Sequence, residues 1–84
     1  MQIQNSLDWF DTKNSLESQL DTLPYNPDLR KMLKNIDSMV DKLSKLEVDA
    51  RRTHVQHYTK EQLEKVNSAI DHLEKLLLMA QLMR

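Results

Sequence analysis

The chain has 84 residues, a net charge of −1 and neither cysteine nor glycine. A chain this short buries only about 60% of its unfolded surface, so a deep catalytic pocket has little room, and its charge argues against bulk attraction to nucleic acid or anionic membranes. Without cysteine there are no disulfides or thiolate metal sites, and without glycine there are no phosphate-binding loops of the P-loop or dinucleotide type. Few β-branched residues and abundant Leu, Lys, Glu, Gln and Met, together with the absence of glycine, predict one all-α domain over residues 1–84. The exclusions above also lead us to expect no cofactor and no enzymatic activity.

The start of the chain, MQIQNSLDWF, lacks the basic residues and the apolar run of a secretory signal. Elsewhere no apolar run approaches the roughly 18 residues that a membrane span needs. We therefore expect a soluble, cytoplasmic protein.

The first expected helix spans about residues 6–22. Trp9 and Phe10 are both expected to anchor it in the core, because large aromatic side chains dominate core energetics. The segment is acidic, since residues 1–23 hold four acids and one base and therefore carry a charge of −3. The side that would pack along the later helices carries Trp9, Leu16, Leu20 and Leu23.

The second expected helix spans about residues 27–56. At its start Asn26 can cap, Pro27 can take the first helical position, and Asp28 meets the positive end of the helix dipole. Acids precede bases by four residues at Asp41–Lys45 and Glu47–Arg51, which is typical of a solvated helix face. The apolar stripe of this helix carries Leu29, Met32, Leu33, Ile36, Met39, Val40, Leu43, Leu46 and Ala50.

The third expected helix spans about residues 60–83. Thr59 and Gln62 have the spacing of a capping box, and Tyr58 and Leu63 have that of a hydrophobic staple, so we expect the helix to begin there. Its apolar stripe carries Leu63, Val66, Ala69, Ile70, Leu73, Leu76, Leu77 and Ala80.

Stripes this wide suit a helical bundle better than a narrow two-stranded coiled coil. The short connection before the third helix predicts that the second and third helices lie antiparallel. The expected fold is therefore a three-helix antiparallel bundle, made of a short N-terminal helix and a long αα-hairpin, which oligomerisation could complete.

The expected tip of the hairpin is basic, with the sequence RRTHVQHYTK over residues 51–60. Its cations could contact phosphates while Tyr58 stacks on a base, but cations also gather at helix C-termini, where they complement the dipole. Three bases are fewer than the roughly six to ten phosphate contacts of strong non-specific binding, so we do not expect nucleic acid as the partner. Nor do we expect metal at the two histidines, because a helix start at Thr59 would turn Glu61 away from them. This candidate contact patch consists of Arg51, Arg52, His54, His57, Tyr58 and Lys60.

The chain ends in the apolar sequence LEKLLLMAQLMR, residues 73–84. At about 100° per residue, the face centred on Leu78, Met79 and Leu82 lies about 160° from the main stripe of the third helix. Further upstream this face is polar, so it becomes apolar abruptly over the last two turns. Three coverings are open: the first helix, a second copy of the chain, or a different protein. The candidate interface consists of Leu78, Met79, Leu82 and Met83.

These features predict a non-enzymatic protein–protein interaction module that acts by helix packing through its C-terminal helix. Such a module would be an adaptor, a chaperone-like factor or a regulatory or inhibitory accessory protein, with another protein or a second copy as its partner. The alternative is a small nucleic-acid-binding regulator that uses the basic residues 51–60. For catalysis, neither a strained turn bearing a serine nor an isolated pair of carboxylates is recognisable.

Overall fold

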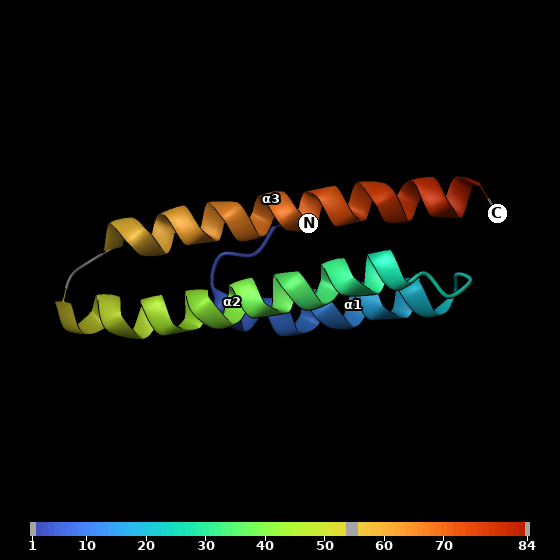
Figure 1. Cartoon of the computed structure of the whole chain (residues 1–84). Helices are drawn as coiled ribbons and strands as arrows, with labels where there is room; N and C mark the ends of the chain where they lie inside the picture. The colour runs from blue at the N-terminus through green and yellow to red at the C-terminus, as the bar shows by residue number, and fades with distance from the viewer. Residues whose placement is uncertain (1, 54–55, 84) are drawn as a thin grey trace.

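The computed structural model describes residues 2–53 and 56–83, with side chains outside 50–53 and 56–58. It contains a single turn of 3₁₀ helix, η1 (Ser6–Asp8), followed by the α-helices α1 (Trp9–Asp21), α2 (Pro27–Thr53) and α3 (Gln56–Leu82) (Figure 1). No strand occurs in these described ranges. The expected all-α fold is confirmed.

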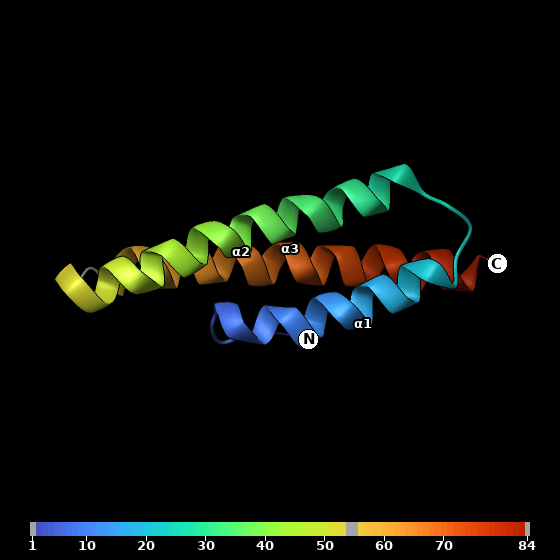
Figure 2. The same cartoon turned by 90° about the horizontal axis from the view of Figure 1, so that it is seen from below.

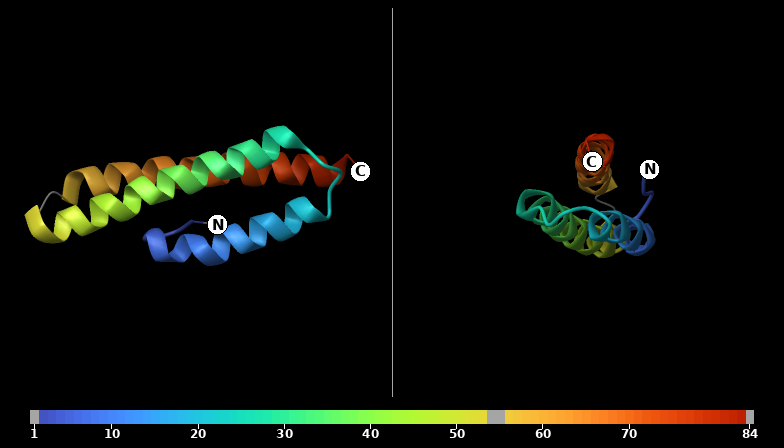
Figure 3. Two further views of the ribbon diagram at one scale, coloured as in Figure 1. Left: turned by 60° about the horizontal axis from the view of Figure 1, so that its bottom comes forward. Right: turned by 90° about the vertical axis from the view of Figure 1, so that its right-hand side faces the viewer.

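The helices form a three-helix bundle that is triangular in cross-section (Figure 3). The two long helices α2 and α3 run antiparallel and pack against each other. Helix α1 runs beside the half of the hairpin that contains the start of α2 and the end of α3 (Figure 2). The molecule is elongated, at 49 × 18 × 15 Å. Because α1 has 13 residues and each long helix has 27, the other half of the hairpin is a two-helix structure.

The core is built from the apolar stripes expected of the sequence. Leucine, isoleucine and valine at i, i+3, i+4 and i+7 spacings place one face of each long helix toward the other two helices. Met32 and Met39 of α2 and Leu76 of α3 pack against the edge of this core. The fully buried side chains from the three α-helices include Leu16, Ile36, Leu43, Val66, Ile70, Leu73 and Leu77.

Only one of the two aromatic residues at the start of α1 enters the core. Trp9 is 4% exposed, as expected, but Phe10 is 71% exposed, so the expectation that Phe10 anchors the core is wrong. Successive residues of a helix point about 100° apart. Trp9 shares its side with the buried Leu16 and Leu20, and Phe10 therefore points outward.

The start of α2 has the predicted cap. The Asn26 side-chain oxygen accepts hydrogen bonds from the backbone amides of Asp28, at 3.0 Å, and Leu29, at 3.3 Å. These bonds satisfy amides that have no partner within the helix. Pro27 is the first helical residue, in the position where its missing N–H is not needed.

The start of α3 differs from the prediction. The helix begins at Gln56, so Thr59 lies inside it and the expected capping box is wrong. Both side chains of that box bond across the hairpin instead: the Thr59 hydroxyl donates to the Leu46 carbonyl at 3.3 Å, and the Gln62 amide donates to the Met39 carbonyl at 3.1 Å. The packed neighbouring helix offers acceptors that local spacing cannot reveal. The Tyr58 side chain, and with it the staple, lies outside the described residues.

The N-terminal segment binds both long helices. Ile3 is buried, its backbone amide donates to the Asn67 side-chain oxygen at 2.8 Å, and the Asn67 amide donates back to the Ile3 carbonyl at 2.9 Å. The backbone amide of Ser6 donates to the two carboxylate oxygens of Glu47 at 3.0 and 3.2 Å. The segment thereby holds η1 against α2 and fixes Ile3 on α3. It extends the covered part of the hairpin beyond the start of α1.

Candidate partner-binding surface

The C-terminal end of α3 carries a cluster of exposed apolar side chains that we call the tail face: Leu78, Met79, Leu82 and Met83. They are 56%, 56%, 76% and 83% exposed, respectively. Leu73 and Leu77 on the opposite side of the same helix are fully buried. The last two turns of α3 are therefore apolar on both sides, and only one side is covered within the chain.

The first helix does not cover the tail face. Its contact with this part of α3 runs through Gln19, whose side-chain oxygen lies 3.5 Å from the Gln81 amide nitrogen. Leu78 lines the margin of a shallow hollow beside this contact, together with Gln19 and Lys75. The covering by α1 that the sequence left open is therefore excluded for Leu82 and Met83, while a second copy and a different protein stay open.

Next to the tail face, the connection between α1 and α2 and the end of α3 enclose a small hollow of about 240 Å³, the end groove. Tyr25, which is 78% exposed, stands at its margin. The lining is mostly apolar, so the groove fits an apolar side chain. Its apolar lining residues are Leu23, Pro24, Tyr25, Leu29, Ala80 and Met83.

A larger hollow of about 530 Å³, the basic groove, lies between α1 and α2. The two helices separate gradually toward the 22–26 connection (Figure 2). Glu17 and Asp37 contribute carboxylates to the walls, and Tyr25 closes the end that adjoins the end groove. The cationic lining residues are Lys13, Arg30, Lys31 and Lys34.

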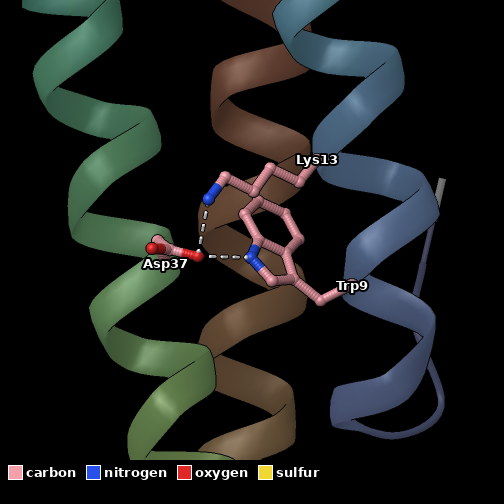
Figure 4. A network of polar contacts seen from close by, with 3 residues as sticks. All are labelled: Trp9, Lys13 and Asp37. Carbon is pink, nitrogen blue, oxygen red and sulfur yellow. Dashed lines mark hydrogen bonds and ion pairs between the residues drawn. The ribbon is translucent and has the colours of Figure 1, made fainter.

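At the end of the basic groove away from Tyr25, the carboxylate of Asp37 on α2 binds two side chains of α1 (Figure 4). Oδ1 of Asp37 accepts a hydrogen bond from the Trp9 indole nitrogen at 3.0 Å and forms an ion pair with the Lys13 ammonium at 3.2 Å. The indole N–H of a buried tryptophan needs a partner, and Asp37 supplies it from the facing helix. The indole hydrogen bond, and after it the hydrogen bond and charge of Lys13, hold the pKa of Asp37 below its ordinary value of 3.8, against an opposing effect of burial.

We expect this network to make stability depend on pH in the acid range. A carboxylate whose folded pKa is lowered stabilises the protein fully above its unfolded pKa, and this contribution is lost as the pH falls through the folded pKa. Asp37→Asn should therefore lose less stability than wild type between about pH 5 and pH 2. The side chain of Asp37 is 48% exposed, so the difference will be small. Urea unfolding midpoints at the two pH values measure it.

Asp41→Asn is the matched control for this prediction, because Asp41 is an exposed carboxylate on the same helix whose ion pair, with Lys45 at 3.4 Å, stays within α2. This substitution removes one carboxylate from α2 and leaves the Trp9 hydrogen bond in place. Equal acid dependence in Asp37→Asn and Asp41→Asn would contradict the role of the Trp9 hydrogen bond.

The candidate basic patch at the hairpin tip lies almost wholly outside the described side chains. This holds for Arg51, Arg52, His54, His57 and Tyr58. Only Lys60 is described there, and its side chain is exposed. Among the residues whose side chains are described, no group of three or more His, Asp or Glu could hold a metal ion.

Sequence reasoning missed the basic groove and the Trp9–Lys13–Asp37 network. On α2, Arg30, Lys34 and Asp37 follow the i, i+4, i+7 spacing of one helix stripe, a signal that the sequence does contain. Charges at such spacings usually mark a solvated face, however. These side chains line a groove because α1 lies beside this stripe of α2. The periodicity of a single helix does not reveal which helix packs beside it.

Comparison of the chain with models of protein families, with curated proteins and with solved structures gives no match. Across the described ranges, no helix combines the length and the apolar character that crossing a membrane requires. The support for a binding surface is therefore its geometry. The tail face, the end groove and the basic groove lie next to one another at the same end of the bundle.

Proposed function

We propose that the chain is a non-enzymatic interaction module that binds another protein through the tail face. The observation that carries this proposal is the exposure of four large apolar side chains at the end of α3, a helix whose core stripe is fully buried. Two of the four are methionines, whose flexible and polarisable side chains suit an adaptable contact surface. An adaptor, a chaperone-like factor or an inhibitory accessory protein would act in this way, by occupying its partner.

Energetics favour a partner that contacts more than the tail face. Covering it would be worth roughly 4–8 kcal/mol, if each side chain contributes about 1.5–3 kcal/mol scaled by its exposed fraction. Two tail faces in a symmetric dimer would gain roughly twice that, against an association cost of about 4–15 kcal/mol. This leaves a self-associated dimer little surplus. A different protein that also fills the end groove gains further apolar contact, and we propose such a partner.

Leu78→Glu combined with Leu82→Glu tests the proposal. Tagged wild type and double variant are used to capture proteins from the cells that make the chain, and each captured protein is then purified and its affinity measured by calorimetry. We expect a partner that binds wild type and binds the double variant at least about 100-fold more weakly, because two carboxylates would be desolvated in the interface.

Leu7→Glu combined with Phe10→Glu is the matched control, since Leu7 and Phe10 are 83% and 71% exposed and do not belong to the tail face. This control should bind like wild type. Equal losses in both double variants, or none in the tail variant, would contradict the proposal. Micromolar self-association of wild type that the tail variant abolishes would identify a second copy as the occupant instead.

A further inference from the structure

We infer that the basic groove binds an acidic segment of the partner protein, lying next to an apolar residue that occupies the end groove. This inference rests on the proposed function, because it names the chemistry of the partner that covers the tail face. Its own support is independent of the tail face and comes from the size, the charges and the position of the groove between α1 and α2.

The groove has the dimensions of a short peptide site. Along α2 it extends from Pro27 to Asp37, which at 1.5 Å per residue is about 15 Å. An extended chain advances about 3.3 Å per residue, so roughly four or five residues would span this length. The volume of about 530 Å³ is within the range of binding clefts.

Two of the four cations of the groove are paired with carboxylates, and the other two have no such partner among the described residues. Lys13 is paired with Asp37, and Arg30 with Asp21 at 2.9 Å. Lys31 and Lys34 have no ion-pair or hydrogen-bond partner within the part of the chain that the structure describes. Positive charge is therefore uncompensated along the middle of the α2 wall, at Lys31 and Lys34, and carboxylates of a bound segment would meet it there.

The walls of the basic groove favour a peptide with spaced acidic residues over a nucleic acid. Glu17 and Asp37 bring fixed negative charge into the same groove, which would repel the closely spaced phosphates of a nucleic acid. A peptide can place its acidic residues opposite Lys31 and Lys34 and avoid these positions. The two acids also reduce the charge of the groove's four cations to a net +2, which is less than strong phosphate binding uses.

Tyr25 links the charged and apolar parts of the surface. Its ring lines both the basic groove and the end groove, and the Arg30 guanidinium carbon lies 6.0 Å from the ring centroid. A segment that crosses Tyr25 would leave an apolar environment and enter a cationic one within a few residues. The chemistry expected of the partner segment is therefore an apolar residue followed by acidic residues at intervals.

The test uses the full chain and three fluorescein-labelled probes. The first probe is a peptide with two leucines followed by two glutamates that alternate with serines. The second probe replaces the glutamates by glutamines, and the third is a short single-stranded oligothymidylate. Binding is followed by fluorescence anisotropy and by the amide and indole NMR resonances. Since Trp9 is the only tryptophan and bonds to Asp37 in the groove wall, its single indole resonance reports occupancy.

We expect the acidic peptide alone to bind, with shifts at Trp9 and around Arg30, and to weaken with salt. Lys31→Glu combined with Lys34→Glu should reduce its affinity at least about tenfold, since two attractive charges become repulsive. The matched control, Lys42→Glu with Lys65→Glu, makes the same charge change at exposed lysines that do not line the groove, and should bind nearly as wild type does.

Equal binding of the glutamine peptide, equal losses in the two lysine variants, or no binding of the acidic peptide would overturn the inference. Tighter binding of oligothymidylate would overturn it in favour of nucleic acid. These outcomes are separable from the proposed function, because the tail variant Leu78→Glu, Leu82→Glu keeps the basic groove. If the acidic peptide does not bind but a partner still binds through the tail face, only this inference is wrong. If the acidic peptide binds but no partner depends on the tail face, only the proposed function is wrong.

Discussion

Replacing Ile70 or Ile36 by alanine should destabilise the bundle by about 2–5 kcal/mol, because each substitution leaves a cavity in a packed core. Ile70 is fully buried on α3, and Ile36, 2% exposed, belongs to the same core from α2. A domain of this size has a total stability of only about 5–15 kcal/mol. The melting temperature should therefore fall by at least about 8 °C in each variant.

Thermal unfolding followed by circular dichroism measures this effect. Leu78→Ala is the matched control on the same helix as Ile70, because Leu78 is 56% exposed and loses far less buried surface. It should melt close to wild type. An Ile70→Ala variant that melted within a degree or two of wild type would show that the pairing of α2 with α3 is wrong.

Replacing Trp9 by alanine should cost about 3–5 kcal/mol, the usual range for a buried aromatic side chain. Trp9 combines core packing with the indole hydrogen bond that reaches Asp37 on α2. Trp9→Phe keeps much of the buried volume and removes the N–H donor, so it should cost less and should raise the pKa of Asp37 toward its ordinary value. Urea unfolding at neutral pH gives the costs, and NMR titration of the Asp37 carboxyl gives the pKa.

Phe10→Ala tests the side of α1 that faces the core. Because Phe10 is largely exposed, its removal should change stability by about 0.5 kcal/mol or less. If Phe10→Ala lost more stability than Trp9→Ala, the side of α1 that faces the core would be the one that carries Phe10.

Periodicity was enough to predict the hairpin. The stripes that include Ile36 and Ile70 each follow one helical face over several turns, and burial of such a face is the main source of helix stability in a protein. The Asn26 cap was predictable for a similar reason, since the side chain acts on amides two and three residues away. Interactions within one helix or one turn are visible in the sequence.

Contacts between helices were not predictable in this way. The hydroxyl of Thr59 bonds to the Leu46 carbonyl on the other long helix, although its local spacing is typical of a cap. Phe10 is as apolar as Trp9, and which of them enters the core depends on how α1 is rotated against α2 and α3. The basic groove likewise depends on which stripe of α2 lies beside α1.

The most direct test of the tail face as a binding surface is thermal unfolding of wild type and of the Leu78→Glu, Leu82→Glu variant, each alone and with the purified partner. Since both leucines are exposed in the folded chain, the two proteins alone should have the same helicity and melt within about 2 °C of each other. The partner should raise the melting temperature of wild type only, because binding to the folded state stabilises it. Lost helicity in the variant alone, or equal stabilisation of both proteins by the partner, would contradict the account.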